Sequence, residues 1–309
     1  MLEIKSDAPL GKVTTFKIGG NSRAAALVGS VDELKEACAF ADGAGLAFRV
    51  LGGGSNVLVG DDGFDGLIIW YRDRTFEIDA STGIIRVGGG AITAQVAGAA
   101  ARAGLTGFEW AAGVPGTIGG AIYGNAGASG GEMKEVVVSV DVFERGETRT
   151  YSAAECGFAY RHSAFKNASG IITAATLRLQ HATQSADPQK KVMEVLRYRM
   201  ETQPKGFAST GCIFKNFEPD ETAIESLRGV GVPEMFLVAR RVPAGWLIEH
   251  AGLKGLRRGA ARVSEVHGNF IINEGGATAG DIIELIELVR GGVEKKFGVR
   301  LTEEITILQ

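Results

Sequence analysis

A glycine-rich segment from Gly113 to Gly131 constrains the fold of this chain more than any other feature. Eight of its 19 residues are glycine. Because each glycine costs conformational entropy in a regular element, the segment is predicted to be neither an ordinary helix nor an ordinary strand. Its small apolar residues are also atypical of a flexible linker. Two interpretations remain: a backbone wall for a flat, phosphate-bearing ligand, or a tight turn in a glycine-rich core.

The composition sets the class of protein. With 309 residues, the chain exceeds what one core usually holds, which predicts two or three domains. Its net charge of −3 does not indicate binding to nucleic acid or to an anionic membrane. Three cysteines, an odd number, argue against a disulfide framework and favour a reducing compartment. With no apolar leader and no long apolar run, we expect a cytoplasmic protein without membrane insertion.

The hydrophobic pattern predicts an α+β fold with few long helices. Helices are predicted near residues 31–42, 92–103, 188–202 and 278–297, the last with an apolar face formed by Ile282, Leu285, Ile286, Val289, Val293 and Phe297. Strands are predicted near residues 47–51, 57–59, 66–71, 74–78, 84–87, 136–143, 148–152, 171–179 and 300–308, with a hairpin turn at Arg145-Gly146 between the strands 136–143 and 148–152. The polar segment 181–188 is predicted to be a domain boundary.

A second glycine-rich loop, Gly52-Gly53-Gly54-Ser55-Asn56, lies between two predicted strands. Successive backbone N–H groups in such a loop can form an anion-binding nest, to which Ser55 and Asn56 would add side-chain donors. A plain hairpin turn is the alternative. Two such loops together favour a large dinucleotide-like ligand. No Rossmann fingerprint or P-loop occurs, and the scattered histidines without a C-x-x-C pair predict no metal site.

Three positions further along could carry chemistry. Arg161 lies among aromatic and hydroxyl residues, where it could pair with a carboxylate or phosphate, or be a solvated surface arginine. The thiol of Cys212 could donate a proton to a carbanion, act as a nucleophile, or simply be buried, as we expect for Cys38 and Cys156. In the last predicted strand, side chains alternate between two faces, and Glu304 lies on the face opposite Ile305 and Ile307. Taken alone, a carboxylate there would indicate only an exposed surface position. The basic segment 240–262 would suit a diphosphate or form a solvated face.

Taken in order, eight motifs resemble the UDP-N-acetylenolpyruvoylglucosamine reductase family over nearly the whole chain. The motifs are T-T-F-K-I-G-G (14–20), L-G-G-G-S-N-V-L (51–58), G-V-P-G-T-I-G-G-A (113–121), N-A-G-A (125–128), Y-R-x-S-x-F-K (160–166), G-C-I-F-K-N (211–216), H-G-N-F-I-I-N (267–273) and L-T-E-E-I (301–305).

The resemblance implies a two-part FAD-binding region of the vanillyl-alcohol-oxidase (PCMH) type and a C-terminal α+β substrate domain. The implied boundaries are 1–66 with 299–309 for the first FAD-binding subdomain, 67–182 for the second, and 187–298 for the substrate domain. The implied cofactor is non-covalent FAD. The implied FAD-binding residues are Gly52, Gly53, Gly54, Ser55, Asn56, Gly113, Pro115, Gly116, Thr117, Gly119, Gly120, Asn125, Ala126 and Gly127.

The implied reaction is the NADPH-dependent reduction of UDP-N-acetylglucosamine enolpyruvate to UDP-N-acetylmuramate for peptidoglycan. Hydride would pass from flavin N5 to C3 of the enolpyruvyl group and leave an enolate. Arg161 and Glu304 match residues that stabilise or protonate this enolate, and Cys212 matches the proton donor to C2. The implied substrate-binding residues are Tyr160, Lys215 and Asn216.

Simple electrostatics agrees with these roles. An arginine fork neutralises the negative charge that develops on the substrate carboxylate. A carboxylate beside an enolate is unfavourable when ionised, so Glu304 is predicted to be neutral or to share a proton.

The chain departs from the family pattern in three places. Cys212 replaces the commoner serine, and Phe217 replaces a usual proline. Only a few residues separate Leu179 from the next predicted helix, which indicates the shorter type without the extra substrate-covering insertion. Two rival interpretations remain: a flavin oxidase of the same fold, although the Gly52–Asn56 loop has no histidine for flavin attachment, and a non-catalytic nucleotide-sugar or flavin-binding module.

Overall fold

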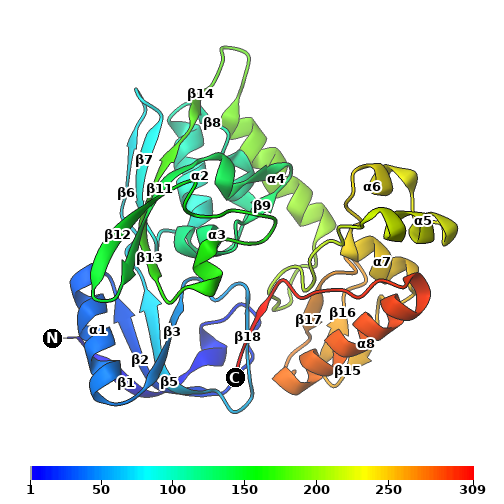
Figure 1. The fold of residues 1–309 in the computed structure, drawn as a ribbon, viewed down its shortest axis with the longest axis horizontal. Coiled ribbons are helices and arrows are strands. Elements are labelled where there is room, and N and C mark those ends of the chain that lie inside the picture. Colours follow the sequence, from blue (N-terminus) through cyan, green and yellow to red (C-terminus); the bar gives the residue numbers. More distant parts are fainter. Residues whose placement is uncertain (1) are drawn as a thin grey trace. The chain divides into compact units, whose positions relative to one another are not determined.

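The computed structural model describes residues 2–309, which form two compact units (Figure 1). The first unit comprises the N-terminal residues to Ala8, Ser22–Gly54 and Asp65–Glu201. The second comprises Pro9–Asn21, Ser55–Phe64 and Thr202–Gln309. The three-part division implied by the family resemblance stays a prediction. No helix within residues 2–309 is both long enough and apolar enough to cross a bilayer.

One sheet of the first unit is built from segments near the N-terminus. Its strand order is β1 (Ile4–Pro9), β2 (Asn21–Val28), β5 (Phe64–Tyr71) and β3 (Ala47–Leu51). Helix α1 (Val31–Gly43) begins where the Ser30 hydroxyl accepts the N–H of Glu33 at 3.2 Å. Its Leu34 and Ala37 are fully buried in the same core as Leu67 of β5. The predicted helix and both predicted strands of this region are confirmed.

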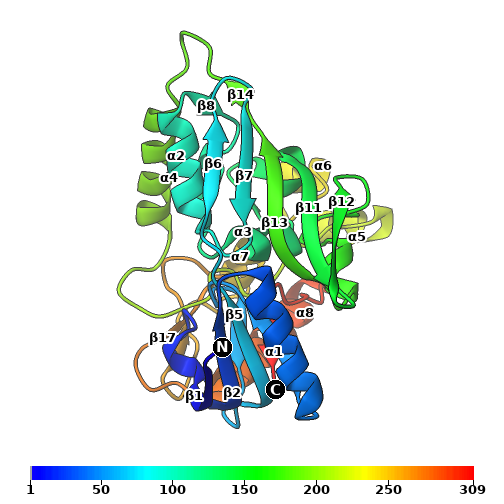
Figure 2. The ribbon, with the colours of Figure 1, turned by 90° about the vertical axis from the view of Figure 1, so that its left-hand side faces the viewer.

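The other sheet of the first unit is antiparallel, and Figure 2 shows its five strands side by side. Its order is β12 (Glu147–Ser152), β11 (Val137–Glu144), β13 (Ile171–Arg178), β7 (Ile84–Gly88) and β6 (Phe76–Asp79). The predicted hairpin turn at Arg145-Gly146 is confirmed, with both residues at positive φ, as a two-residue turn of type I′ requires.

Helices and short strand pairs complete the first unit. They are α2 (Thr93–Arg102), α3 (Ile118–Tyr123), α4 (Pro188–Thr202), and the pairs β8 (Leu105–Thr106) with β14 (Gln180–His181) and β9 (Gly127–Ala128) with β10 (Gly131–Glu132). Val96 of α2 and Ile118 of α3 are fully buried in one core with Leu177 of the antiparallel sheet.

The glycine-rich segment differs from its prediction, because it contains the short helix α3 and the strand pair β9–β10. Thr117 caps α3 by accepting the N–H of Gly120, and Ile118 and Ile122 bury its apolar side. Capping and burial therefore offset the low helix propensity of the glycines.

The second unit is organised around α8 (Ala279–Phe297), whose buried residues Ile282, Leu285, Ile286, Val289, Val293 and Phe297 confirm the predicted apolar face. Its N-terminus is capped by Thr278 and also by Asp61, which accepts the N–H groups of Ala279 and Gly280. The other elements are β4 (Val57–Val59), α5 (Glu221–Gly229), α6 (Glu234–Val238), α7 (Ala244–His250), β15 (Arg257–Arg258), β16 (Ala261–Val263), β17 (Ile271–Asn273) and β18 (Thr306–Leu308).

The predicted strand at residues 300–308 is only partly correct. Regular pairing is confined to β18, which runs parallel to β4, while Glu303 forms an isolated bridge with Phe214. The expected alternation also fails, because Ile307 is exposed and Leu308 is buried. The reason is that residues 302–304 pair with the segment around Phe214, whereas β18 pairs with β4.

Candidate active site

In the first unit, the glycines 52–54 of the second loop lie against the glycine-rich segment 113–131. A Cβ on Gly53 would lie 2.6 Å from the Cα of Gly116, and one on Gly52 would overlap the hydroxyl of Thr117. Arg72 donates to the carbonyl of Gly52 at 2.7 Å. The hairpin alternative for the Gly52–Asn56 loop is wrong, because the strands on its two sides belong to different sheets.

The glycines also allow close backbone packing within the segment 113–131. The N–H of Gly119 donates to the carbonyl of Gly89 at 2.8 Å, and a Cβ on Gly127 would lie 2.6 Å from the carbonyl oxygen of Gly131. The backbone of Gly53, Gly119 and Gly127 is nevertheless partly exposed. This side-chain-free surface fits a flat group that lies against the backbone, such as the ring system of FAD.

Asn125 holds the glycine-rich segment in place. It is fully buried at a φ of 42°, a left-handed conformation that asparagine tolerates better than most residues. Its amide nitrogen donates to Glu132 at 2.8 Å and to the carbonyl of Ala159 at 2.9 Å, and its oxygen accepts the N–H of Lys134 at 3.0 Å. The side chain of Asn125 therefore ties together three segments of the first unit.

Arg161 lies in a tight turn that docks on this segment. Ala159 and His162 exchange two backbone hydrogen bonds of 3.1 Å, and Arg161 between them has a φ of 51°. Its guanidinium donates to the carbonyl of Gly127 at 2.7 Å and lies 5.2 Å from the ring centre of Tyr160. A solvated surface arginine would need none of these contacts. A positive φ at a non-glycine residue costs about 1 kcal/mol or more and often marks a functional position.

In the second unit, the segment that follows Cys212 runs between two other segments. On one side, Ile213 donates to the carbonyl of Asn269 at 2.9 Å, and the side chain of Asn269 bonds both backbone groups of Phe214 at 2.8 and 2.9 Å. On the other side, Glu304 donates its N–H to the carbonyl of Ile213 at 2.8 Å. The backbones of Cys212 and Glu304 are thus held on neighbouring segments.

The side chains of Asn56 and Asn216 form hydrogen bonds with the backbone of the second unit. The Asn56 amide donates to the carbonyl of Glu304 at 3.0 Å, so it helps to hold the Glu304 segment. The Asn216 oxygen accepts the N–H of Ala244 at 3.1 Å, at the start of α7. The neighbouring Lys215 donates its own N–H to the carbonyl of Thr302 at 2.9 Å.

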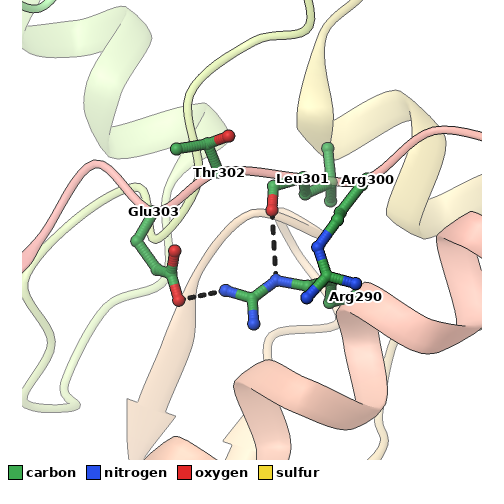
Figure 3. Close-up of a pocket in the computed structure, with 5 residues that line it drawn as sticks. All are labelled: Arg290, Arg300, Leu301, Thr302 and Glu303. Carbon is green, nitrogen blue, oxygen red and sulfur yellow. Dashed lines mark hydrogen bonds and ion pairs between the residues drawn. The ribbon is translucent and has the colours of Figure 1, made fainter.

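Sequence reasoning missed two buried side chains that organise these segments. Asn269 lies in the motif 267–273, but its bonds to Phe214 were not foreseen. Arg290 is a charged residue on the apolar face of α8 and is only 8% exposed. It donates to the carbonyl of Leu301 at 3.1 Å and pairs with Glu303 (Figure 3). A charge at a core position of a helix was the sequence signal for such a role.

The basic segment 240–262 does not form an open cationic surface. Each of its six basic residues pairs with a carboxylate: Arg240 with Glu221, Arg241 with Glu218, Lys254 with Glu249, Arg257 and Arg262 with Glu274, and Arg258 with Glu284. These pairs favour the solvated-face interpretation over a diphosphate site.

The other cysteines fit the prediction of small buried apolar residues. Cys156 is fully buried, and burial, with a smaller contribution from the charge of Glu155, raises the pKa of its thiol to about 11. Burial and then the charge of Asp42 raise the pKa of Cys38, which is half-buried. Thiols with raised pKa values are poor nucleophiles at neutral pH.

Two family profiles match most of the chain. Residues 22–151 match the family described as FAD binding domain, and residues 203–308 match the family described as UDP-N-acetylenolpyruvoylglucosamine reductase, C-terminal domain. The predicted fold class, an FAD-binding region followed by a C-terminal α+β domain, is confirmed.

Relatives of known name cover nearly all of the chain. The UDP-N-acetylenolpyruvoylglucosamine reductase of Synechococcus sp. (strain RCC307) is 37% identical, covering 98% of this chain and 93% of the relative. That of Solibacter usitatus is 34% identical, covering 98% and 96%. The crystal structure of UDP-N-acetylenolpyruvylglucosamine reductase from Thermus caldophilus is 34% identical with a TM-score of 0.78, covering 100% of this chain and 99% of that one. The chain therefore belongs to the UDP-N-acetylenolpyruvoylglucosamine reductase family.

Proposed function

We propose that this chain uses NADPH and non-covalent FAD to reduce UDP-N-acetylglucosamine enolpyruvate to UDP-N-acetylmuramate in the cytoplasm. The observation that carries the proposal is the pairing of the Cys212 and Glu304 segments, within the part of the chain that matches the family's C-terminal domain. Bound FAD would supply the hydride that is added to C3 of the enolpyruvyl group. The glycine-rich loops, Gly52–Asn56 and Gly113–Gly127, would hold this cofactor.

Arg161 would neutralise the charge that develops on the substrate during hydride addition. The enolate formed there spreads into the adjacent carboxylate, which the planar guanidinium fork can bind with two hydrogen bonds. The tight turn and the bond to Gly127 support this role, because they restrict the arginine before the substrate arrives. Tyr160, Lys215 and Asn216 would bind other parts of the same substrate.

Cys212 would give its proton to C2 of the enolate, and Glu304 would stabilise the same species while neutral or sharing a proton. A thiol with an ordinary pKa near 8.5 is mostly protonated at neutral pH and is therefore a competent acid. The backbone hydrogen bond between Ile213 and Glu304 supports a joint role for Cys212 and Glu304, because it holds the two residues on adjacent segments.

The decisive assay is NADPH consumption by the FAD-loaded protein with and without UDP-N-acetylglucosamine enolpyruvate. We expect fast oxidation of NADPH only when the enolpyruvyl substrate is present. Oxidation at the same rate without it, or oxygen uptake with a sugar alcohol instead of NADPH, would contradict the proposal and favour a flavin oxidase.

Substitutions at Cys212 test the proton-donor role. Cys212→Ser should remain active, because the hydroxyl can also deliver a proton. Cys212→Ala should leave flavin reduction by NADPH intact and slow reoxidation by the substrate by about 100-fold or more, the range lost with a general acid. Equal losses in both half-reactions, measured by stopped-flow absorbance, would exclude this role.

A further inference from the structure

Arg290 is a buried cation with several protein acceptors and no role in the chemistry proposed above. It projects from α8, and its guanidinium bonds the carbonyl of Leu301 and the carboxylates of Glu303 and Glu287. A guanidinium at 8% exposure is costly unless such partners compensate its desolvation. Figure 3 shows that Leu301 and Glu303 both turn toward Arg290 from the segment beyond α8. The arginine therefore clamps this segment to the helix.

The clamped segment leads directly into Glu304. Thr302, inside the clamp, accepts the N–H of Lys215 at 2.9 Å, and Glu304 donates to Ile213 at 2.8 Å. These two bonds align the Glu304 segment with the segment that carries Cys212. Because Arg290 fixes residues 301 and 303, it also fixes the register in which Glu304 meets its neighbour. A lysine also has three donors, but it lacks the planar fork that lets the guanidinium meet acceptors on separate residues, so it would match this geometry poorly.

The cavity around Arg290 is not an anion site. Its volume is about 370 Å³, and Arg290, Arg300 and Thr302 contribute to its lining. Arg290 is already balanced by two carboxylates, and Arg300 pairs with Glu294 at 3.2 Å. An entering anion would therefore meet three carboxylates against two guanidinium groups, which leaves an internal role for Arg290.

We infer that Arg290 is a positioning residue for Glu304, acting through its clamp on Leu301 and Glu303. The inference rests on the proposed function, because it assumes that Glu304 acts on the enolate. A displacement of about 1 Å at a reacting group can cost as much as 100-fold in rate. Loss of the clamp should therefore slow the oxidation of reduced flavin by the enolpyruvyl substrate and leave cofactor binding and flavin reduction by NADPH unchanged.

The test compares Arg290→Gln with the control Arg300→Gln, which removes the other arginine of the same cavity. In Arg290→Gln, substrate-dependent flavin reoxidation should fall about 10- to 100-fold. Its FAD content, its rate of flavin reduction by NADPH and its KM for the enolpyruvyl substrate should stay within about twofold, and Arg290→Lys should recover only part of the rate. Arg300→Gln should behave as the wild type. If Arg290→Gln does not fold, Glu303→Gln removes the same ion pair at a more exposed residue and should slow reoxidation alone.

A double-mutant comparison separates positioning from general destabilisation. Adding Arg290→Gln to Glu304→Gln should slow reoxidation less than twofold further, because the group being positioned is already gone. An equal slowing in both backgrounds, or wild-type reoxidation in Arg290→Gln and Glu303→Gln, would overturn the inference. A wild-type protein that does not couple NADPH oxidation to the enolpyruvyl substrate would instead overturn the proposed function.

Discussion

Replacing Gly53 by alanine tests whether the contact between the two glycine-rich loops forms the cofactor site. The added methyl carbon would lie 2.6 Å from the Cα of Gly116, about 1 Å inside an ordinary carbon–carbon contact. The backbone fixes the position of the added Cβ, and the Cα of Gly116 is itself backbone, so no side chain can rotate away and the loops must separate. Overpacking of this kind costs about 1–3 kcal/mol. The cost should fall on the folded unit and on the affinity for FAD, which at 1–3 kcal/mol weakens by about 5- to 150-fold.

Two measurements are needed for this variant: urea unfolding of the apoprotein and titration with FAD, followed by the change in flavin fluorescence. The matched control is Gly43→Ala, at the end of α1, where an added methyl group meets nothing within 4 Å. The control should bind FAD as the wild type does and should be neutral or more stable by up to about 1 kcal/mol.

Wild-type affinity for FAD together with unfolding at the wild-type urea concentration in Gly53→Ala would refute a cofactor site at this contact. A loss of stability without a loss of affinity would also be informative. It would mean that the loops pack as described but that FAD binds elsewhere.

Three further predictions concern buried groups. Asn125→Ala should cost about 2–4 kcal/mol in urea unfolding, because it leaves buried polar groups, including the carbonyl of Ala159, without this hydrogen-bond partner. Asn269→Ala should cost about 2–3 kcal/mol in urea unfolding, because the buried N–H and carbonyl of Phe214 lose their partner. A smaller loss would contradict the two hydrogen bonds between Asn269 and Phe214. The pKa of Cys156 lies near 9 in the unfolded chain and at about 11 in the fold, so the folded state holds this proton more tightly. The stability that this proton contributes is therefore complete below pH 9, and the free energy of unfolding falls by up to about 1.4 kcal/mol per pH unit as the pH rises toward 11. Cys156→Ala should abolish this pH dependence.

Local signals in the sequence predicted the elements that local forces form. The apolar face of α8 was visible because its spacing follows the helix period, and the Arg145-Gly146 turn was visible because a glycine, which favours positive φ, separates two strand-like runs. Strands of two or three residues, such as β15 and β16, carry too few residues for a period to emerge. Both strands pack against α8, a long-range contact that no local pattern records.

The candidate site was predictable only through the family resemblance. Nothing in the residues around Cys212 indicates that Glu304 pairs beside it, because the bond is long-range in sequence. The basic segment 240–262 was misleading for the same reason, since carboxylates such as Glu218 and Glu284 come from outside it. The structure places Arg161 on the glycine-rich segment and Cys212 beside the Glu304 segment, while their chemical roles stay predictions.

The pairing of β4 with β18 has a consequence for synthesis on the ribosome. Asn56 and Glu304, which flank this pairing, are 248 residues apart, so at about 5–20 residues per second β4 waits roughly 12–50 s for its partner. During that time its backbone groups are open to other chains. With only three residues, Val57–Val59, the strand offers a minimal template for aggregation. The short length of β4 thus protects the nascent chain during a long delay that the topology makes unavoidable.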